Sequence, residues 1–91
     1  MTLNLYELAT FVGNKLGKYI SYDGKLSNEE KIDKVEKLLK IYNSISGDKD
    51  YDVLVKVIKD AVKEVVHRSK QIGFSNQEIE SLEKINNEIN G

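Results

Sequence analysis

Apolar residues recur with helical spacing in four segments of the chain, and polar residues fill the positions between them. The four segments span approximately residues 4–20, 27–46, 50–72 and 75–89. Charged residues break any alternation with a period of two, so the pattern does not favour strands. Short connections favour antiparallel neighbours. The sequence therefore predicts an all-α protein: a small antiparallel four-helix bundle of two helical hairpins, without a sheet, in a single domain over residues 1–91.

Capping residues and glycines mark the predicted helix ends. Two segments begin with a serine followed three residues later by a glutamate, which is the spacing of a capping box: Ser27 with Glu30, and Ser75 with Glu78. Gly47 and Gly73 follow the second and third segments, at the position where many helices stop. The chain contains no proline, so no residue of that kind interrupts the long segments.

The first predicted helix carries small residues at four-residue spacing, namely Ala9, Gly13 and Gly17. Residues four apart lie on one face of a helix, so this line allows a neighbouring helix to approach closely. Leu16 and Ile20 belong to the expected inner face of the same helix.

The third predicted helix is the most apolar of the four. Its expected inner face comprises Tyr51, Leu54, Ile58, Ala61, Val62, Val65 and Ile72. Three more valines widen the apolar surface: Val53, Val57 and Val66. The helix is therefore either central to the fold, or it leaves an apolar side for a protein partner or a second copy of the chain. These three valines are our apolar candidates for partner binding.

Cationic side chains form a line along the same segment: Lys56, Lys59, Lys63, His67 and Lys70. On one helix they fall within roughly 80° of arc, with Arg68 at the edge. Lysines arranged in this way can neutralise consecutive phosphates of a nucleic acid. A second group places charge beside aromatic rings that can stack on unpaired bases, namely Lys15, Lys18 and Lys25 with Tyr19 and Tyr22. If the two regions were adjacent, they would form one positive surface.

The same charges also fit an ordinary solvated helix face. Asp52, Asp60 and Glu64 lie four residues from Lys56 or Arg68, which is the spacing of weak ion pairs. The fourth segment is predominantly acidic, with Glu78, Glu80, Glu83 and Glu88 against a single lysine. With 14 basic and 15 acidic side chains the net charge is -1, so any electrostatic binding depends on local segregation of charge.

Composition excludes several kinds of chemistry. The absence of cysteine removes disulfides, thiolate nucleophiles and sulfur-ligated zinc. The single histidine, His67, has no partner at a spacing typical of catalysis or of zinc binding. We therefore predict no catalytic residue, no metal ligand and no cofactor, and expect a protein that is not an enzyme. No apolar run reaches the length of a membrane span, so we expect no membrane partner and a cytoplasmic location.

A near repeat precedes the second and fourth segments, at residues 26–30 and 74–78. The stretch 19–30 resembles an EF-hand loop, in which five residues would occupy the fifth, sixth, eighth, ninth and twelfth positions: Asp23, Gly24, Leu26, Ser27 and Glu30. The resemblance implies that Glu30 would be a bidentate calcium ligand. The stretch departs from the family at the first and third positions, which hold Tyr19 and Ser21. It is also similar to a helix start in tellurite-resistance B-type domains, and it equally fits a capped helix after a turn.

The sequence favours a non-enzymatic helical binding protein that acts as an accessory or regulatory subunit of a larger complex. That complex could be one that processes nucleic acid. The first alternative is direct binding of nucleic acid, without sequence specificity, through the lysine line of the third helix. The second alternative is a degenerate EF-hand-like domain that binds a cation. Association into a homo-oligomer is also left open.

Overall fold

Five α-helices and one short 3₁₀-helix make up most of residues 16–91, the part of the chain that this computed structural model describes. In chain order they are α2 (Leu16–Tyr22), α3 (Asn28–Ile45), the 3₁₀-helix η1 (Lys49–Tyr51), α4 (Asp52–His67), α5 (Ser69–Ile72) and α6 (Asn76–Asn90). These residues contain no strand, so the predicted all-α class is confirmed for them.

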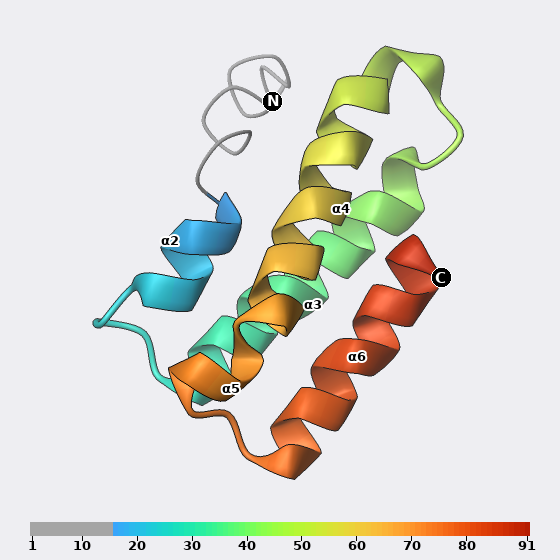
Figure 1. The fold of residues 1–91 in the computed structure, drawn as a ribbon. Coiled ribbons are helices and arrows are strands. Elements are labelled where there is room, and N and C mark those ends of the chain that lie inside the picture. The colour runs from blue at the N-terminus through green and yellow to red at the C-terminus, as the bar shows by residue number, and fades with distance from the viewer. Residues whose placement is uncertain (1–15) are drawn as a thin grey trace.

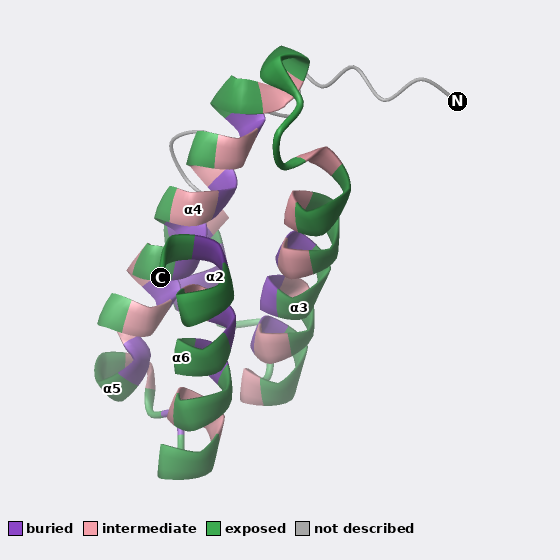
Figure 2. Ribbon diagram, turned by 90° about the vertical axis from the view of Figure 1, so that its right-hand side faces the viewer, coloured by how far each residue is buried: buried purple, intermediate pink, exposed green. Residues whose placement is uncertain are grey.

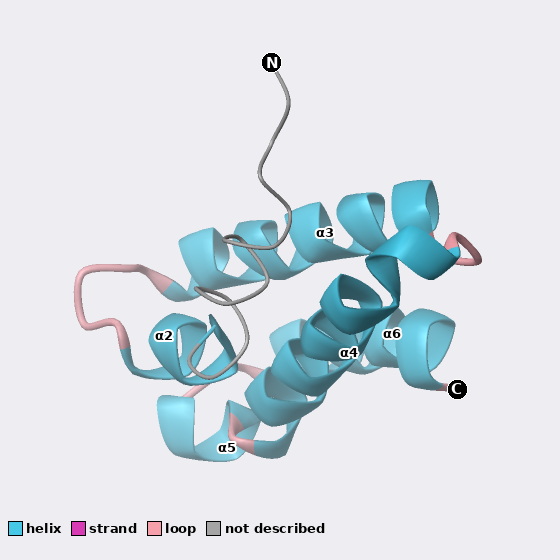
Figure 3. Cartoon of the chain, turned by 90° about the horizontal axis from the view of Figure 1, so that it is seen from above, coloured by secondary structure: helices cyan, strands magenta, loops and turns pink. Residues whose placement is uncertain are grey.

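Helix α4 occupies the centre of the described structure, where it contacts α2, α3 and α6. Figure 1 shows α2 and α6 on either side of α4, with α3 behind, and successive long helices run in opposite directions. Seen from above, α3 and α4 cross obliquely (Figure 3). The complete four-helix bundle stays a prediction, because most of its first helix lies outside the described residues.

The core lies where these helices face one another, and the buried positions form inward stripes along them (Figure 2). Within residues 16–91 twelve apolar side chains are buried: Ile20, Val35, Leu38, Leu54, Ile58, Ala61, Val62, Val65, Phe74, Leu82, Ile85 and Ile89. Five of the twelve belong to α4, which accounts for the unusually apolar sequence of that helix. Tyr51 and Ile72, which were expected on the same inner face, are only half-buried.

Both predicted capping boxes are confirmed. The Ser27 hydroxyl accepts the Glu30 amide at 3.1 Å, and the Glu30 carboxylate accepts the Ser27 amide at 3.2 Å. Ser75 and Glu78 make the equivalent pair of bonds at 3.2 and 2.9 Å. Gly73 ends α5 with a φ of 92°, a left-handed conformation that glycine adopts without steric cost.

The predicted continuous helix over residues 50–72 is wrong in one respect, because the structure interrupts it at Arg68. There the backbone takes φ -98° and ψ 6°, which ends α4 at His67 and starts the short α5 at Ser69. The Ser69 hydroxyl is one cause, since it donates to the Val66 carbonyl at 2.8 Å and such back-bonding bends helices. Ser69 itself is buried. The N-terminal end also differs, because η1 precedes α4 and α4 begins at Asp52.

Two features attach α2 to the rest of the fold. Gly17 lies against α4 so closely that a Cβ atom there would be 2.7 Å from Cβ of Glu64 and 3.0 Å from the carbonyl oxygen of Ala61. The buried Lys31 of α3 donates from Nζ to the Ser21 carbonyl at 3.2 Å. The expected close approach at Gly17 is thus confirmed, whereas Ala9 and Gly13 lie outside the described residues.

Replacement of Gly17 by alanine should destabilise the protein. Alanine favours a helix over glycine by about 1 kcal/mol, but overpacking a tight contact costs about 1–3 kcal/mol. The new methyl group would meet the carbonyl oxygen of Ala61 and the Cβ and Cγ atoms of Glu64. Since a carbonyl oxygen and a Cβ are fixed by the backbone, the two helices must move apart. We expect the free energy of unfolding in urea to fall by about 1 kcal/mol.

The matched control is Gly24→Ala, because a Cβ at Gly24 meets no atom within 4 Å. Its free energy of unfolding should stay the same or rise slightly. An unchanged or higher stability of Gly17→Ala would show that α2 and α4 do not depend on this contact.

Candidate binding face of α2 and α4

The cationic candidates of the third predicted helix lie at the surface, but they do not form one uninterrupted line. Lys56, Lys63 and His67 are exposed on α4, and Lys59 is half-buried. Lys70 is exposed too, but it belongs to α5, beyond the break at Arg68. The predicted row therefore extends along α4 and stops at His67.

Helix α2 lies beside the C-terminal half of α4 and adds its own surface residues. Lys18, Tyr19 and Tyr22 are all exposed, and the two rings retain 50% and 57% of their accessible surface. Lys15 lies outside the described residues. The structure thus places Tyr22 against Arg68 and brings Lys18 within electrostatic range of Glu64. A continuous positive surface over α2 and α4 stays a prediction.

Arg68 joins the two helices through its side chain. Its Nε donates to the Glu64 carboxylate, and its Nη1 donates to the Tyr22 hydroxyl. The guanidinium carbon also lies 5.1 Å from the centre of the Tyr22 ring, which is within the range of a cation–π contact. Glu64 and Arg68 are both half-buried, so this network is partly shielded from water.

The hydrogen bond from Arg68 lowers the pKa of the Glu64 carboxyl group below its ordinary value of 4.5, although partial burial acts in the opposite direction. The positive charges of Arg68, His67 and Lys18 lower it further. In return, the bond to Glu64 raises the pKa of Arg68. Both groups are therefore charged at neutral pH. The influence of Lys18 also shows that a charge of α2 acts on a side chain of α4.

The charges of α4 between residues 52 and 60 compensate one another. Lys56 Nζ lies 3.7 Å from an oxygen of Asp60, and both side chains are well exposed. An exposed pair of this kind adds little to stability, but it leaves this part of the helix without net charge.

The three valine candidates differ in exposure. Val53 is 70% exposed, and Val57 is half-buried. Val66 is also half-buried, and it packs against the core. Among the described residues Val53 is therefore the most accessible of the three. It lies one helical turn before Val57 and beside the Lys56–Asp60 pair.

One functional contact was not recognised from the sequence pattern. Tyr19 and Tyr22 were both expected as stacking surfaces, and the three-residue spacing places them on one face of α2. Glu64 was expected to pair with Arg68 on a solvated face, and in the structure it accepts the bond that orients Arg68 towards Tyr22. No local signal predicts the contact with Tyr22, which lies 46 residues away in the sequence.

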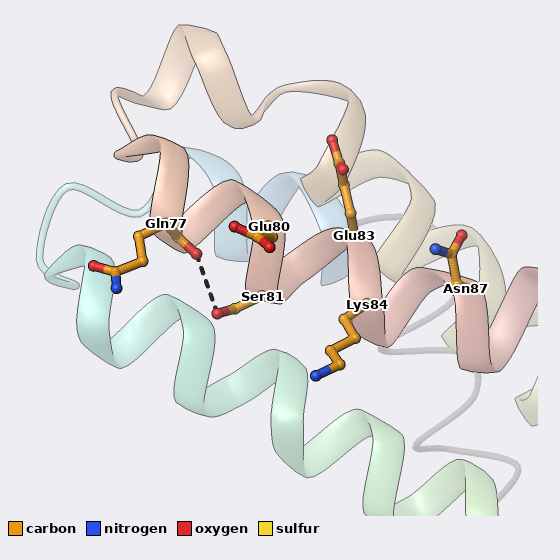
Figure 4. A pocket seen from close by; sticks show the side chains of 6 residues that line it. All are labelled: Gln77, Glu80, Ser81, Glu83, Lys84 and Asn87. Atoms are coloured by element: carbon orange, nitrogen blue, oxygen red, sulfur yellow. Dashed lines mark hydrogen bonds between the residues drawn. The ribbon is translucent and has the colours of Figure 1, made fainter.

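Shallow hollows also occur on the acidic side of the molecule. One of about 470 Å³ lies on α6 and is lined by Gln77, Glu80, Ser81, Glu83, Lys84 and Asn87 (Figure 4). Another of about 570 Å³ lies between α3 and α6, where four carboxylates of α3 and Glu78 surround Ile32. Within residues 16–91 no three histidine, aspartate or glutamate side chains gather in a way that would hold a metal ion.

The residues that resemble an EF-hand form local bonds in the structure. Asp23 accepts the Lys25 amide at 2.8 Å, and Glu30 belongs to the capping box of α3. The segment is thus a turn followed by a capped helix.

Comparison with protein-family models, with curated proteins and with solved structures gives no match for this chain. Of the helices within residues 16–91, none combines the length and the apolar character that crossing a membrane requires.

Removal of the Glu64 charge should reduce stability in a pH-dependent manner. Because the folded state lowers the Glu64 pKa, the ionised carboxylate stabilises the fold fully above pH 4.5, and this contribution is lost as the pH falls through the folded-state pKa. We expect Glu64→Gln to unfold at a lower urea concentration than the wild type at pH 7. The difference should disappear at pH values well below 4.5.

Glu80→Gln is a suitable control, since Glu80 is exposed on α6 and forms no ion pair within the described residues. Its urea midpoint should match that of the wild type at each pH. If the urea midpoint of Glu64→Gln stayed below that of the wild type by the same amount in acid, the variant would have lost packing and not a charge interaction.

Proposed function

We propose that the protein is a non-enzymatic helical binding protein, an accessory or regulatory subunit that docks on a protein partner in the cytoplasm through the N-terminal half of α4. The observation that carries the proposal is the 70% exposure of Val53. A large apolar group at the surface is informative when its neighbours form a coherent patch with it.

The neighbours of Val53 on α4 suit a protein interface. We call Val53, Lys56, Val57 and Asp60 the Val53 patch. Its residues are three or four positions apart, so their side chains adjoin on one side of the helix. The patch holds two valines and one mutually neutralising ion pair. Charged residues are depleted at interface centres and common at the polar rim, so the valines would form the centre of this interface and the ion pair its rim.

A valine-to-aspartate change tests the proposal. Val53→Asp should leave the melting temperature nearly unchanged, because an exposed side chain contributes little to the fold. It should abolish recovery of a partner that co-purifies stoichiometrically with tagged wild-type protein from the source cells, as measured by quantitative mass spectrometry. Asn87→Asp on α6 is the control: Asn87 is exposed, and the change adds the same charge.

Two results would contradict the proposal. A large fall in the melting temperature of Val53→Asp would show that Val53 is covered within the folded monomer. Sedimentation of the wild type as a dimer and of Val53→Asp as a monomer would identify a second copy of the chain as the occupant, in place of an external partner.

A further inference from the structure

Residues 61–67 at the end of α4 differ in charge from the Val53 patch, because Glu64 is the only acidic residue among them and it is bonded to an arginine. Glu64 accepts from Arg68, which leaves Lys18 and Lys63 exposed and without an ion pair among residues 16–91. Positions 53 and 63 are about 15 Å apart along the helix, at 1.5 Å per residue. We call Lys18, Tyr19, Tyr22, Lys63, His67 and Arg68 the cationic end.

Two aromatic rings lie at this end and face solvent. Tyr19 and Tyr22 are about half exposed and belong to one side of α2. Arg68 binds the Tyr22 hydroxyl and lies over its ring, so this tyrosine is held in place at the surface without being buried. Exposed rings beside unpaired lysines are the combination by which proteins bind single strands: the lysines attract phosphates and the rings stack on bases.

We propose that the cationic end binds single-stranded nucleic acid without sequence preference, with phosphates at Lys18 and Lys63 and with bases stacked on Tyr19 and Tyr22. A duplex offers no free base faces to the tyrosines, because its bases are stacked on one another. An acidic peptide engages the lysines but offers no planar group for the rings. This activity goes beyond the proposed docking function and uses a different part of α4.

The probe is a fluorescein-labelled thymidine oligonucleotide of about 15 nucleotides, within the length that small single-strand binding folds cover. Fluorescence anisotropy at low salt should give a dissociation constant between about 1 and 100 µM, and the affinity should fall steeply as salt is added. Lys63→Glu should weaken binding by roughly tenfold, since it exchanges attraction of a phosphate for repulsion. Lys18→Glu should do the same from the other helix.

Tyr19 separates stacking from simple charge attraction. Tyr19→Ala should weaken binding by at least about fivefold, whereas Tyr19→Phe keeps the ring and should bind like the wild type. Lys84→Glu on α6 changes the net charge as much as Lys63→Glu does and should have little effect. All these side chains are exposed, so circular dichroism should show the same helical content and melting behaviour in each variant.

Three results would overturn the inference. The first is no change in anisotropy at protein concentrations on the order of 100 µM in low salt. The second is binding that Tyr19→Ala leaves intact, or that a labelled polyglutamate peptide or duplex DNA reproduces with equal affinity. The third is equal loss of binding in Lys84→Glu and Lys63→Glu. Val53→Asp should bind the oligonucleotide normally, so failure of the docking function and failure of this inference are distinguishable.

Discussion

The close approach of α2 to α4 at Gly17 is the contact on which the candidate surface depends. Since Gly17 has no side chain, α2 lies directly against Ala61 and Glu64. This position brings Tyr22 within reach of Arg68, although the two residues are 46 positions apart in the sequence. A larger residue at position 17 would separate the helices and with them the tyrosine and the arginine. A packing constraint thus determines which polar groups meet at the surface.

The break at Arg68 has a similar effect on the end of α4. In a continuous helix, Lys70 would extend the cationic row, and Arg68 would lie at its border. In the structure α4 ends at His67, and Arg68 is held by Glu64 on its own helix and by Tyr22 on the neighbouring one. The chain then turns through α5, where Ser69 is buried, and brings Phe74 into the core. Lys70 belongs to α5 and therefore does not continue the row on α4.

Much of the fold could be predicted from the sequence because it depends on local signals. The capping boxes at Ser27 and Ser75 mark the starts of α3 and α6 to within a residue. The inner faces follow from apolar periodicity, as the burial of Leu54, Ile58 and Val62 shows. The break at Arg68 was missed, because helical spacing continues through it and the hydroxyl bond of Ser69 leaves no periodic signal. The contact between Tyr22 and Arg68 was missed because it is tertiary.

The electrostatic character of α4 also depends on geometry more than on composition. Asp60 and Glu64 both lie four residues before or after a basic partner, and spacing alone makes them equivalent. In the structure they differ, because the Lys56–Asp60 pair lies in water whereas Glu64 and Arg68 are half-buried beside α2. The side chains of the first pair are largely exposed, whereas Arg68 of the second pair also donates to the Tyr22 hydroxyl. The carboxylate of Glu64 therefore neutralises Arg68, and within residues 16–91 no carboxylate pairs with Lys18 or Lys63.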